Sequence, residues 1–235
     1  MRGKLIVIEG TDCSGKETQT NKLMEKLNND GIKIVKYCYP NYNSPTGKIV
    51  GGPYLGKKYI CDGWFSEGAT NVDPKVASLY YAADRRYDLV NIKEKLDNGY
   101  NVILDRYVYS NMGHQGGKIL DKEERFKMYE WLETLEFKLL ELEVPDIRLF
   151  LHMPYDAALE LRKGRLEEAD QHEASKEHLI NAENSYLEIA KKYNFKTIEC
   201  VNENGIRSID EINDEIYSFV KKKVRDTTTC QVLTK

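Results

Sequence analysis

Short apolar runs alternate with longer helical patterns along the whole of this 235-residue chain. The runs fall at 5–8, 32–37, 100–104, 147–152 and 195–201. Each is short and almost free of charged residues at its centre, and most follow a glycine turn or a proline. These are the features of strands that are buried on both faces of a parallel sheet.

Apolar residues at helical spacing fill the intervals between the runs. The expected helices are 17–29, 74–98, 122–143, 155–166, 175–193 and 209–223. In the longest pattern the apolar positions are Val76, Leu79, Tyr80, Ala83, Tyr87 and Val90. The alternation predicts an α/β fold of three layers, in which helices surround a parallel sheet of about five strands. We expect one domain over 1–225 and a loose tail over 226–235.

Two segments do not follow either pattern. Residues 39–72 are rich in glycine and tyrosine, and residues 163–174 are charged and open near Gly164. Irregular segments of this length inside a compact domain are often functional. We therefore expect both segments to contribute to a binding site.

Composition limits the classes of function. The formal net charge of −3 gives no overall basic field, so we expect no nucleic-acid partner. The apolar run at 5–8 is too short for a signal peptide or a membrane span, so we expect no membrane association. The five cysteines are scattered and form no C-x-x-C pair, which favours reduced thiols and a cytoplasmic location.

Residues 10–19, GTDCSGKETQ, carry the clearest chemical motif. Gly10, Gly15 and Lys16 stand in the G-x-x-x-x-G-K register of a phosphate-binding loop (P-loop), between an apolar strand and a helix. There the loop N–H groups and the helix N-terminus point at one anion, and Lys16 reaches the terminal phosphates. A plain glycine turn is the weaker alternative. The predicted ATP-binding residues are Gly10, Thr11, Asp12, Cys13, Ser14, Gly15, Lys16, Glu17 and Thr18.

A carboxylate follows the run YNVIL at the expected edge of the sheet. Asp105 is predicted to hold Mg²⁺ there, directly or through water, although an aspartate in this place can also cap a turn. Glu17 stands where the motif usually has the Ser or Thr hydroxyl that binds the metal. Two interpretations remain open. Glu17 takes the metal or its water, or it points outward and leaves the metal to Asp105, the phosphates and water.

Several blocks of the chain together resemble the thymidylate kinase family over nearly its whole length. They read EGTDCSGKETQ, YPNYNSPTGKI, LYYAADRR, ILDRYVYSNMGHQGG and LEFKLLELEVPDIRLFLHMP. The resemblance implies a P-loop kinase with a lid at about 162–174, which transfers phosphate from ATP to dTMP with Mg²⁺. It also implies a homodimer with the long helix near the interface. The alternatives are a kinase of the same fold acting on another nucleotide, and a nucleotide-binding switch protein without transfer chemistry.

The resemblance also implies roles for acceptor-site residues. Tyr81 takes the position that stacks on thymine, Arg85 contacts the carbonyl edge of the base, Arg106 contacts the acceptor phosphate, and Asp12 contacts the sugar 3′-hydroxyl. Tyr81 and Arg85 lie one helical turn apart and so share a face, although a surface Tyr–Arg pair would look the same. The further substrate-binding positions are Tyr39, Pro40 and Tyr42 in a turn that closes over the acceptor, and Ser110, Asn111, His114 and Gln115. For Ser110 and Asn111 a helix cap is the alternative.

Two positions depart from the family pattern. His114 stands where the family usually has Tyr or Phe to exclude a ribose 2′-hydroxyl, so strict deoxyribose preference is in question. Gln171 stands where many members have arginine.

Phosphoryl transfer also needs a cation over the transferring group. Members of the family carry this arginine in the loop or in the lid. Cys13 and Ser14 leave the loop without one, so we assign the role to Arg162 and Arg165. A solvated charged helix end is the alternative. The predicted catalytic set is Lys16, Arg106, Arg162, Arg165 and Asp12.

Overall fold

A computed structural model describes the chain at residues 1–162 and 175–229. Its centre is one parallel sheet of five strands in the order β2-β3-β1-β4-β5. The strands are β1 (Leu5–Gly10), β2 (Ile34–Cys38), β3 (Asn101–Asp105), β4 (Ile147–His152) and β5 (Lys196–Glu199). Each falls within or next to a predicted apolar run, so the predicted fold class is confirmed.

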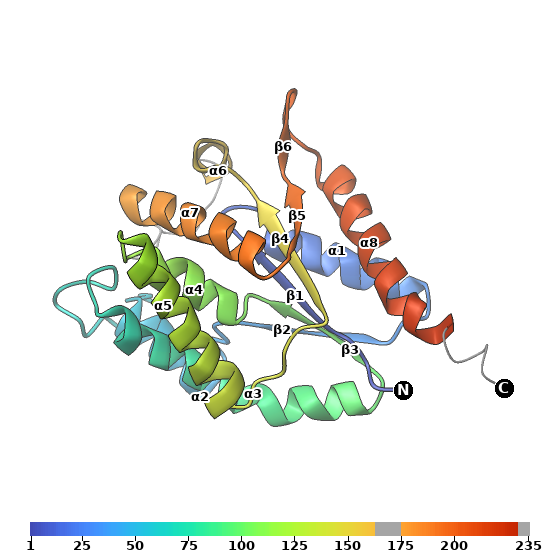
Figure 1. Cartoon of the computed structure of the whole chain (residues 1–235), viewed down its shortest axis with the longest axis horizontal. Helices are drawn as coiled ribbons and strands as arrows, with labels where there is room; N and C mark the ends of the chain where they lie inside the picture. Colours follow the sequence, from blue (N-terminus) through green and yellow to red (C-terminus); the bar gives the residue numbers. More distant parts are fainter. Residues whose placement is uncertain (163–174, 230–235) are drawn as a thin grey trace.

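Helices cover both faces of this sheet (Figure 1). Leu5 and Val7 of β1 point to the face covered by α3 (Pro74–Asp97), α4 (Val108–Gly116) and α5 (Lys122–Glu133). The alternate residues Ile6 and Ile8 point to the face where α1 (Lys16–Asn29) and α8 (Ile209–Thr229) lie side by side. Because side chains alternate along a strand, a central strand covered on both faces is apolar at nearly every position.

Other elements differ from the sequence-based prediction. The segment 39–72 contains α2 (Pro45–Ile49) and a π-helical turn (Val50–Tyr54), and α4 was not predicted at all. The remaining elements are a π-helical turn at Thr134–Leu139 that extends α5, α6 (Tyr155–Arg162), α7 (Lys176–Lys192), and the hairpin strands β6 (Val201–Asn202) and β7 (Gly205–Ile206). Helix α8 continues to Thr229, into the tail predicted to be loose. Residues 230–235 lie outside the described part. None of the described helices is both long and apolar enough to cross a membrane.

The apolar stripe from which the sequence predicted α3 faces solvent and not the sheet. Val76, Leu79, Tyr87 and Val90, which identified the helix in the sequence, are exposed, Val90 to 70%. The side that packs inward is mixed, because buried polar residues there find partners on neighbouring elements. The periodic pattern thus predicted the helix correctly but marked its outer face.

The parallel strands bring their carboxyl ends to one edge. Ile8 of β1 lies opposite Asp105 of β3. The loop after β1 and the turn after β3 therefore emerge next to each other, where α/β sheets commonly bind ligands.

Candidate active site

The loop between β1 and α1 has the backbone that the glycine motif requires. Cys13 and Gly15 adopt positive φ angles of 61° and 72°. A Cβ on Gly10 would lie 2.6 Å from the Ser14 Oγ and 2.7 Å from the Leu151 carbonyl oxygen, so only glycine fits. Helix α1 begins at Lys16, and its first N–H groups face the loop. This is the backbone arrangement that binds phosphate.

The Lys16 ammonium lies inside this loop. Its Nζ donates to the carbonyl oxygens of Gly10 at 2.9 Å and Thr11 at 2.8 Å. Burial, with the nearby charge of Arg106, lowers the pKa of Lys16 to about 8. A phosphate group would reverse this effect by favouring the charged form.

A hollow opens above the loop. The predicted residues from Asp12 to Thr18 line it together with Asp105 and Arg106. Gly10 and Thr11 do not line this hollow, and the Thr11 hydroxyl donates to the Met153 carbonyl at 2.7 Å.

Asp105 and Glu17, the two predicted metal residues, both line this hollow, and the Glu17 side chain is exposed. Within 1–162 and 175–229 no group of three or more His, Cys, Asp or Glu residues is arranged to hold a metal. The donor set is thus one or two carboxylates, which suits Mg²⁺ only when phosphates and water complete its shell.

Arg106 joins the loop to the end of β3. Its backbone has φ 67°, a left-handed conformation that is uncommon for a residue with a side chain. Its N–H donates to the Ile8 carbonyl at 3.1 Å, and its guanidinium donates to Asp12 Oδ1 at 2.6 Å. Burial opposes ionisation of Asp12, but the guanidinium of Arg106 outweighs it and holds the pKa of Asp12 well below its usual range.

Glu9 of β1 forms hydrogen bonds with the residues that follow Arg106. It was not predicted from the sequence. Its side chain is fully buried and accepts from the Tyr107 N–H at 2.8 Å and from the Ser110 hydroxyl at 2.6 Å. Burial raises its pKa to about 7. The sequence feature that could have identified Glu9 is its position as an acidic residue inside an otherwise apolar strand. Ser110, predicted as a pocket residue or a cap, bonds to Glu9 and also lines the neighbouring hollow.

A second hollow holds every substrate-binding residue predicted from the resemblance. Its lining is Asp12, Tyr39, Pro40, Tyr42, Tyr81, Arg85, Arg106, Ser110, Asn111, His114 and Gln115, with Leu55 and Lys57 in addition. Asp12 and Arg106 line both hollows, so the two sites meet at these residues.

Asp84 of α3 fixes the turn at 39–42. Its carboxylate accepts from the Asn41 N–H at 2.8 Å and from the Ser44 hydroxyl at 2.8 Å. Ser44 in turn accepts from the Gly47 N–H and caps α2. The turn that carries Tyr39, Pro40 and Tyr42 is therefore pinned to α3, beside Tyr81 and Arg85.

Arg85 is more deeply buried than a surface Tyr–Arg pair would be. Its side chain is 1% exposed, and its guanidinium donates two hydrogen bonds to the fully buried carboxylate of Glu136. Glu136 also accepts from the Asn111 amide at 3.1 Å. Arg85 thus lines the hollow as one half of a buried ion pair.

Gln115 has the most informative surroundings of the lining residues. It is fully buried, and neither its amide nitrogen nor its amide oxygen has a hydrogen-bond partner among the described residues. The Asn111 side-chain oxygen and the Tyr39 hydroxyl share this property. Because buried polar atoms are nearly always paired, these atoms indicate where a polar ligand belongs.

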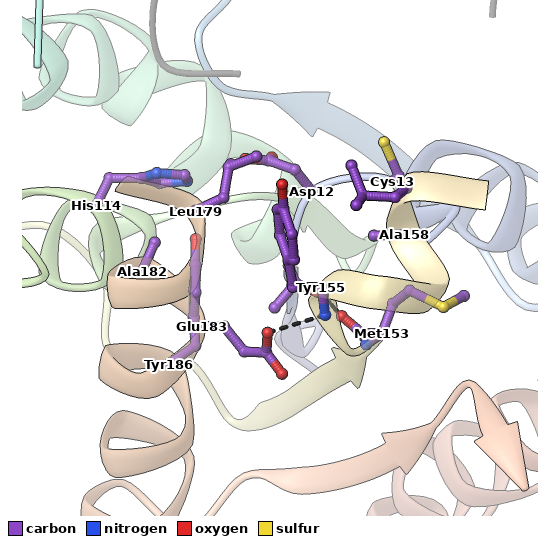
Figure 2. Close-up of a pocket in the computed structure, with 12 residues that line it drawn as sticks. Asp12, Cys13, His114, Met153, Tyr155, Ala158, Leu179, Ala182, Glu183 and Tyr186 are labelled. Atoms are coloured by element: carbon purple, nitrogen blue, oxygen red, sulfur yellow. Dashed lines mark hydrogen bonds between the residues drawn. The ribbon is translucent and has the colours of Figure 1, made fainter. Parts of the chain in front are cut away.

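His114 lines both the acceptor hollow and a third hollow, and Figure 2 shows the third one. Its ring nitrogens lie 3.5 Å from an Arg106 nitrogen and 3.3 Å from His178 Nε2. In the third hollow, whose walls come largely from α6 and α7, the Tyr155 N–H donates to Glu183 at 3.0 Å (dashed line in Figure 2). His178 and Glu183 were not predicted, because nothing in the sequence links them to the motifs.

The predicted lid lies almost entirely outside the described residues. Arg162 is the last residue of α6, and nothing is described of its side chain. Arg165, Gln171 and the rest of 163–174 fall outside the described part.

Comparisons with known proteins agree with this geometry. A family model described as thymidylate kinase matches residues 8–216. A probable thymidylate kinase of Methanocaldococcus jannaschii is 31% identical over 216 residues, which is 92% of this chain and 95% of that protein. The thymidylate kinase of Prochlorococcus marinus is 30% identical over 95% of this chain and all of its own length. A solved structure of the Candida albicans thymidylate kinase has a TM-score of 0.73 at 25% identity and covers 94% of this chain and 92% of its own.

Proposed function

The chain belongs to the thymidylate kinase family, and from this premise we propose that it converts ATP and dTMP to ADP and dTDP. An oxygen of the acceptor phosphate attacks the γ-phosphorus of ATP. The bond from that phosphorus to the β–γ bridging oxygen breaks, and ADP leaves with the electron pair. The acceptor phosphate is already anionic, so no general base is required.

The unpaired amide of Gln115 is the observation that carries the assignment of the acceptor. The imide edge of thymine offers one N–H donor between two carbonyl acceptors, so a single amide satisfies a donor and an acceptor at once. Arg85 has donors only, which favours a carbonyl over the amino group of cytosine at its side of the hollow. Leu55 adds an apolar contact, and Tyr81 supplies a ring on which the base stacks.

The remaining roles follow from where the two hollows meet. Arg106 holds the acceptor phosphate, and Asp12 orients Arg106 and accepts from the sugar 3′-hydroxyl. Lys16 and the loop N–H groups bind the β- and γ-phosphates. Asp105, with or without Glu17, would hold Mg²⁺, which neutralises phosphate charge when bound. Arg162 and Arg165 stabilise the transferring group. Because the imidazole of His114 is smaller than the ring of Tyr or Phe, the preference for deoxyribose over ribose is weaker than in family members that have Tyr or Phe at this position.

The exposed apolar face of α3 supports a homodimer. Val76, Leu79, Tyr87 and Val90 all leave large apolar side chains open to solvent on one long helix. A patch of this kind usually marks an interface. A second copy of the chain is the occupant that the family resemblance implies. Because Tyr81 and Arg85 lie on the same helix, dimer formation would also stiffen the acceptor site. Among the described residues, Cys13, Cys38, Cys61 and Cys200 form no disulfide, and this supports a cytoplasmic location.

A coupled assay of ADP release tests the acceptor directly. The purified protein is incubated with ATP, Mg²⁺ and dTMP, dUMP, dGMP, UMP or CMP in turn. We expect the highest kcat/KM with dTMP, a measurable rate with dUMP, and little stimulation by CMP. If another monophosphate stimulates ADP release and dTMP does not, the kinase assignment would stand but the proposed acceptor would be wrong. No stimulation by any monophosphate would refute the kinase assignment.

A further inference from the structure

The two arginines of the acceptor hollow are each engaged by a carboxylate. Arg106 contacts Asp12 at 2.6 Å, and Arg85 makes its two hydrogen bonds to Glu136. Each pair has no net charge. An acceptor monophosphate, however, brings a charge of about −2 near neutral pH. Its binding therefore calls for a further cation on the wall of this hollow.

Lys57 lies on that wall, and neither the motifs nor the resemblance assigns it a role. It lies in the segment 50–61, which consists of the π-helical turn and the residues that follow it. Its Nζ lies 5.3 Å from the centre of the Tyr42 ring. Tyr42 lines both the acceptor hollow and the hollow above the phosphate loop, so Lys57 lies beside the junction of the two sites.

The backbone around Lys57 is tightly built. The Lys57 N–H donates to the Gly51 carbonyl at 2.8 Å, and the Lys57 carbonyl accepts from Ile60 and Cys61. A Cβ on Gly51 would lie 2.4 Å from the Ile60 side chain and 2.8 Å from Tyr42. Glycine at this position is what allows the turn carrying Lys57 to pack against the turn carrying Tyr42.

The same segment is anchored on its other side. Tyr54 is fully buried and donates to the Ala69 carbonyl at 3.0 Å, and Lys118, in the turn after α4, donates to the Ala69 and Val72 carbonyls. The base of the loop is therefore fixed to the turn that follows α4. The four-carbon stem of Lys57 has several rotatable bonds, which allow its ammonium to exchange the contacts that it makes in this structure for a ligand.

We propose that Lys57 is an acceptor-binding residue that contacts the phosphate of the monophosphate substrate together with Arg106. This rests on the proposed function and names the cation that complements the two carboxylate-engaged arginines. It also gives the irregular segment a role in the reaction, since that segment delivers the lysine to the site.

Binding of dTMP and of thymidine to three variants tests the proposal. Lys57→Met should weaken dTMP binding about 10- to 100-fold, the usual effect of losing one charge-assisted contact. Thymidine, which has no phosphate, should bind with unchanged affinity. Lys57→Arg should recover most of the dTMP affinity because it keeps the charge. In steady-state assays the KM for dTMP should rise more than kcat falls.

Lys58→Met is the matched control. Lys58 is the next residue, its side chain is 78% exposed, and it pairs with the exposed Asp62 at 2.8 Å, so its loss should leave both affinities unchanged. Equal weakening of dTMP and thymidine by Lys57→Met would indicate a structural role and overturn the proposal. The proposal would also be overturned if Lys57→Met bound dTMP as tightly as Lys58→Met does. Failure of the wild-type protein to phosphorylate dTMP would instead count against the proposed function.

Discussion

The guanidinium of Arg106 donates to the Asp12 carboxylate at 2.6 Å, and this contact joins the phosphate loop to the end of β3. Both side chains line the hollow above the loop and the acceptor hollow. The position of the acceptor phosphate is therefore coupled to the loop that holds ATP. Strand pairing places the two residues next to each other, because Ile8 lies opposite Asp105.

Replacing Asp12 by asparagine should reduce kcat/KM for dTMP about 100-fold. The amide keeps the size of the side chain and one acceptor oxygen, but it carries no charge to balance the Arg106 guanidinium and makes a weaker hydrogen bond to it. Unfolding by urea should show a smaller loss of stability than a break in the fully buried pair of Arg85 and Glu136, since the Arg106 and Asp12 side chains are 24% and 12% exposed. Asp62→Asn, which removes an exposed carboxylate, is the matched control. Equal kcat/KM values for the two variants would contradict the role of Asp12.

The buried pair of Arg85 and Glu136 predicts a large effect on stability. Arg85→Met should lower the free energy of unfolding by about 3–5 kcal/mol, because it leaves a buried carboxylate without its partner. The double variant Arg85→Met with Glu136→Met should recover much of this loss but not the affinity for dTMP. Urea unfolding and dTMP titration measure the two effects separately. Recovery of both in the double variant would show that Arg85 does not contact the base.

Glu9 predicts a pH dependence of stability. Its pKa is about 7 in the folded protein against an ordinary 4.5, so the folded state holds the proton more tightly. The resulting stabilisation is fully present below pH about 4.5 and is lost as the pH rises to about 7. Glu9→Gln lacks this titration. Relative to the variant, the wild-type protein should lose up to about 3 kcal/mol across that interval. A difference that stays constant with pH would be the contrary result.

The exposed face of α3 predicts the assembly state. Val90→Glu places a charge on the most exposed residue of that face, and we expect it to turn a dimer into a monomer in sedimentation at micromolar concentration. Leu120→Glu changes an equally exposed apolar residue outside α3 and should leave the dimer intact. A wild-type protein that sediments as a monomer would refute the proposed interface.

The sequence contained most of the fold because the strands of a buried parallel sheet are nearly continuous apolar runs. It contained less of α3, whose apolar stripe proved to be the outer face while Asp84 and Arg85 point inward. Such an orientation depends on partners that are distant in sequence, here Ser44 and Glu136. Period alone cannot identify them.

The motif residues of the site were recognisable because loop geometry and phosphate chemistry restrict their types. The supporting residues were not. Glu9, Glu136 and His178 act through contacts with Ser110, Arg85 and His114, which only the folded chain brings together. Lys57 was not predicted as a site residue for a different reason: it is one lysine among many, and it lies in an irregular segment that has no motif.

Transfer of labelled phosphate from [γ-³²P]ATP to dTMP tests the central claim most directly. Separation of the products should show label in dTDP that appears at the rate of ADP formation. The label should be absent with Lys16→Met, which keeps the acceptor hollow but removes the loop cation. Release of the label as inorganic phosphate, with dTMP unchanged, would contradict the account.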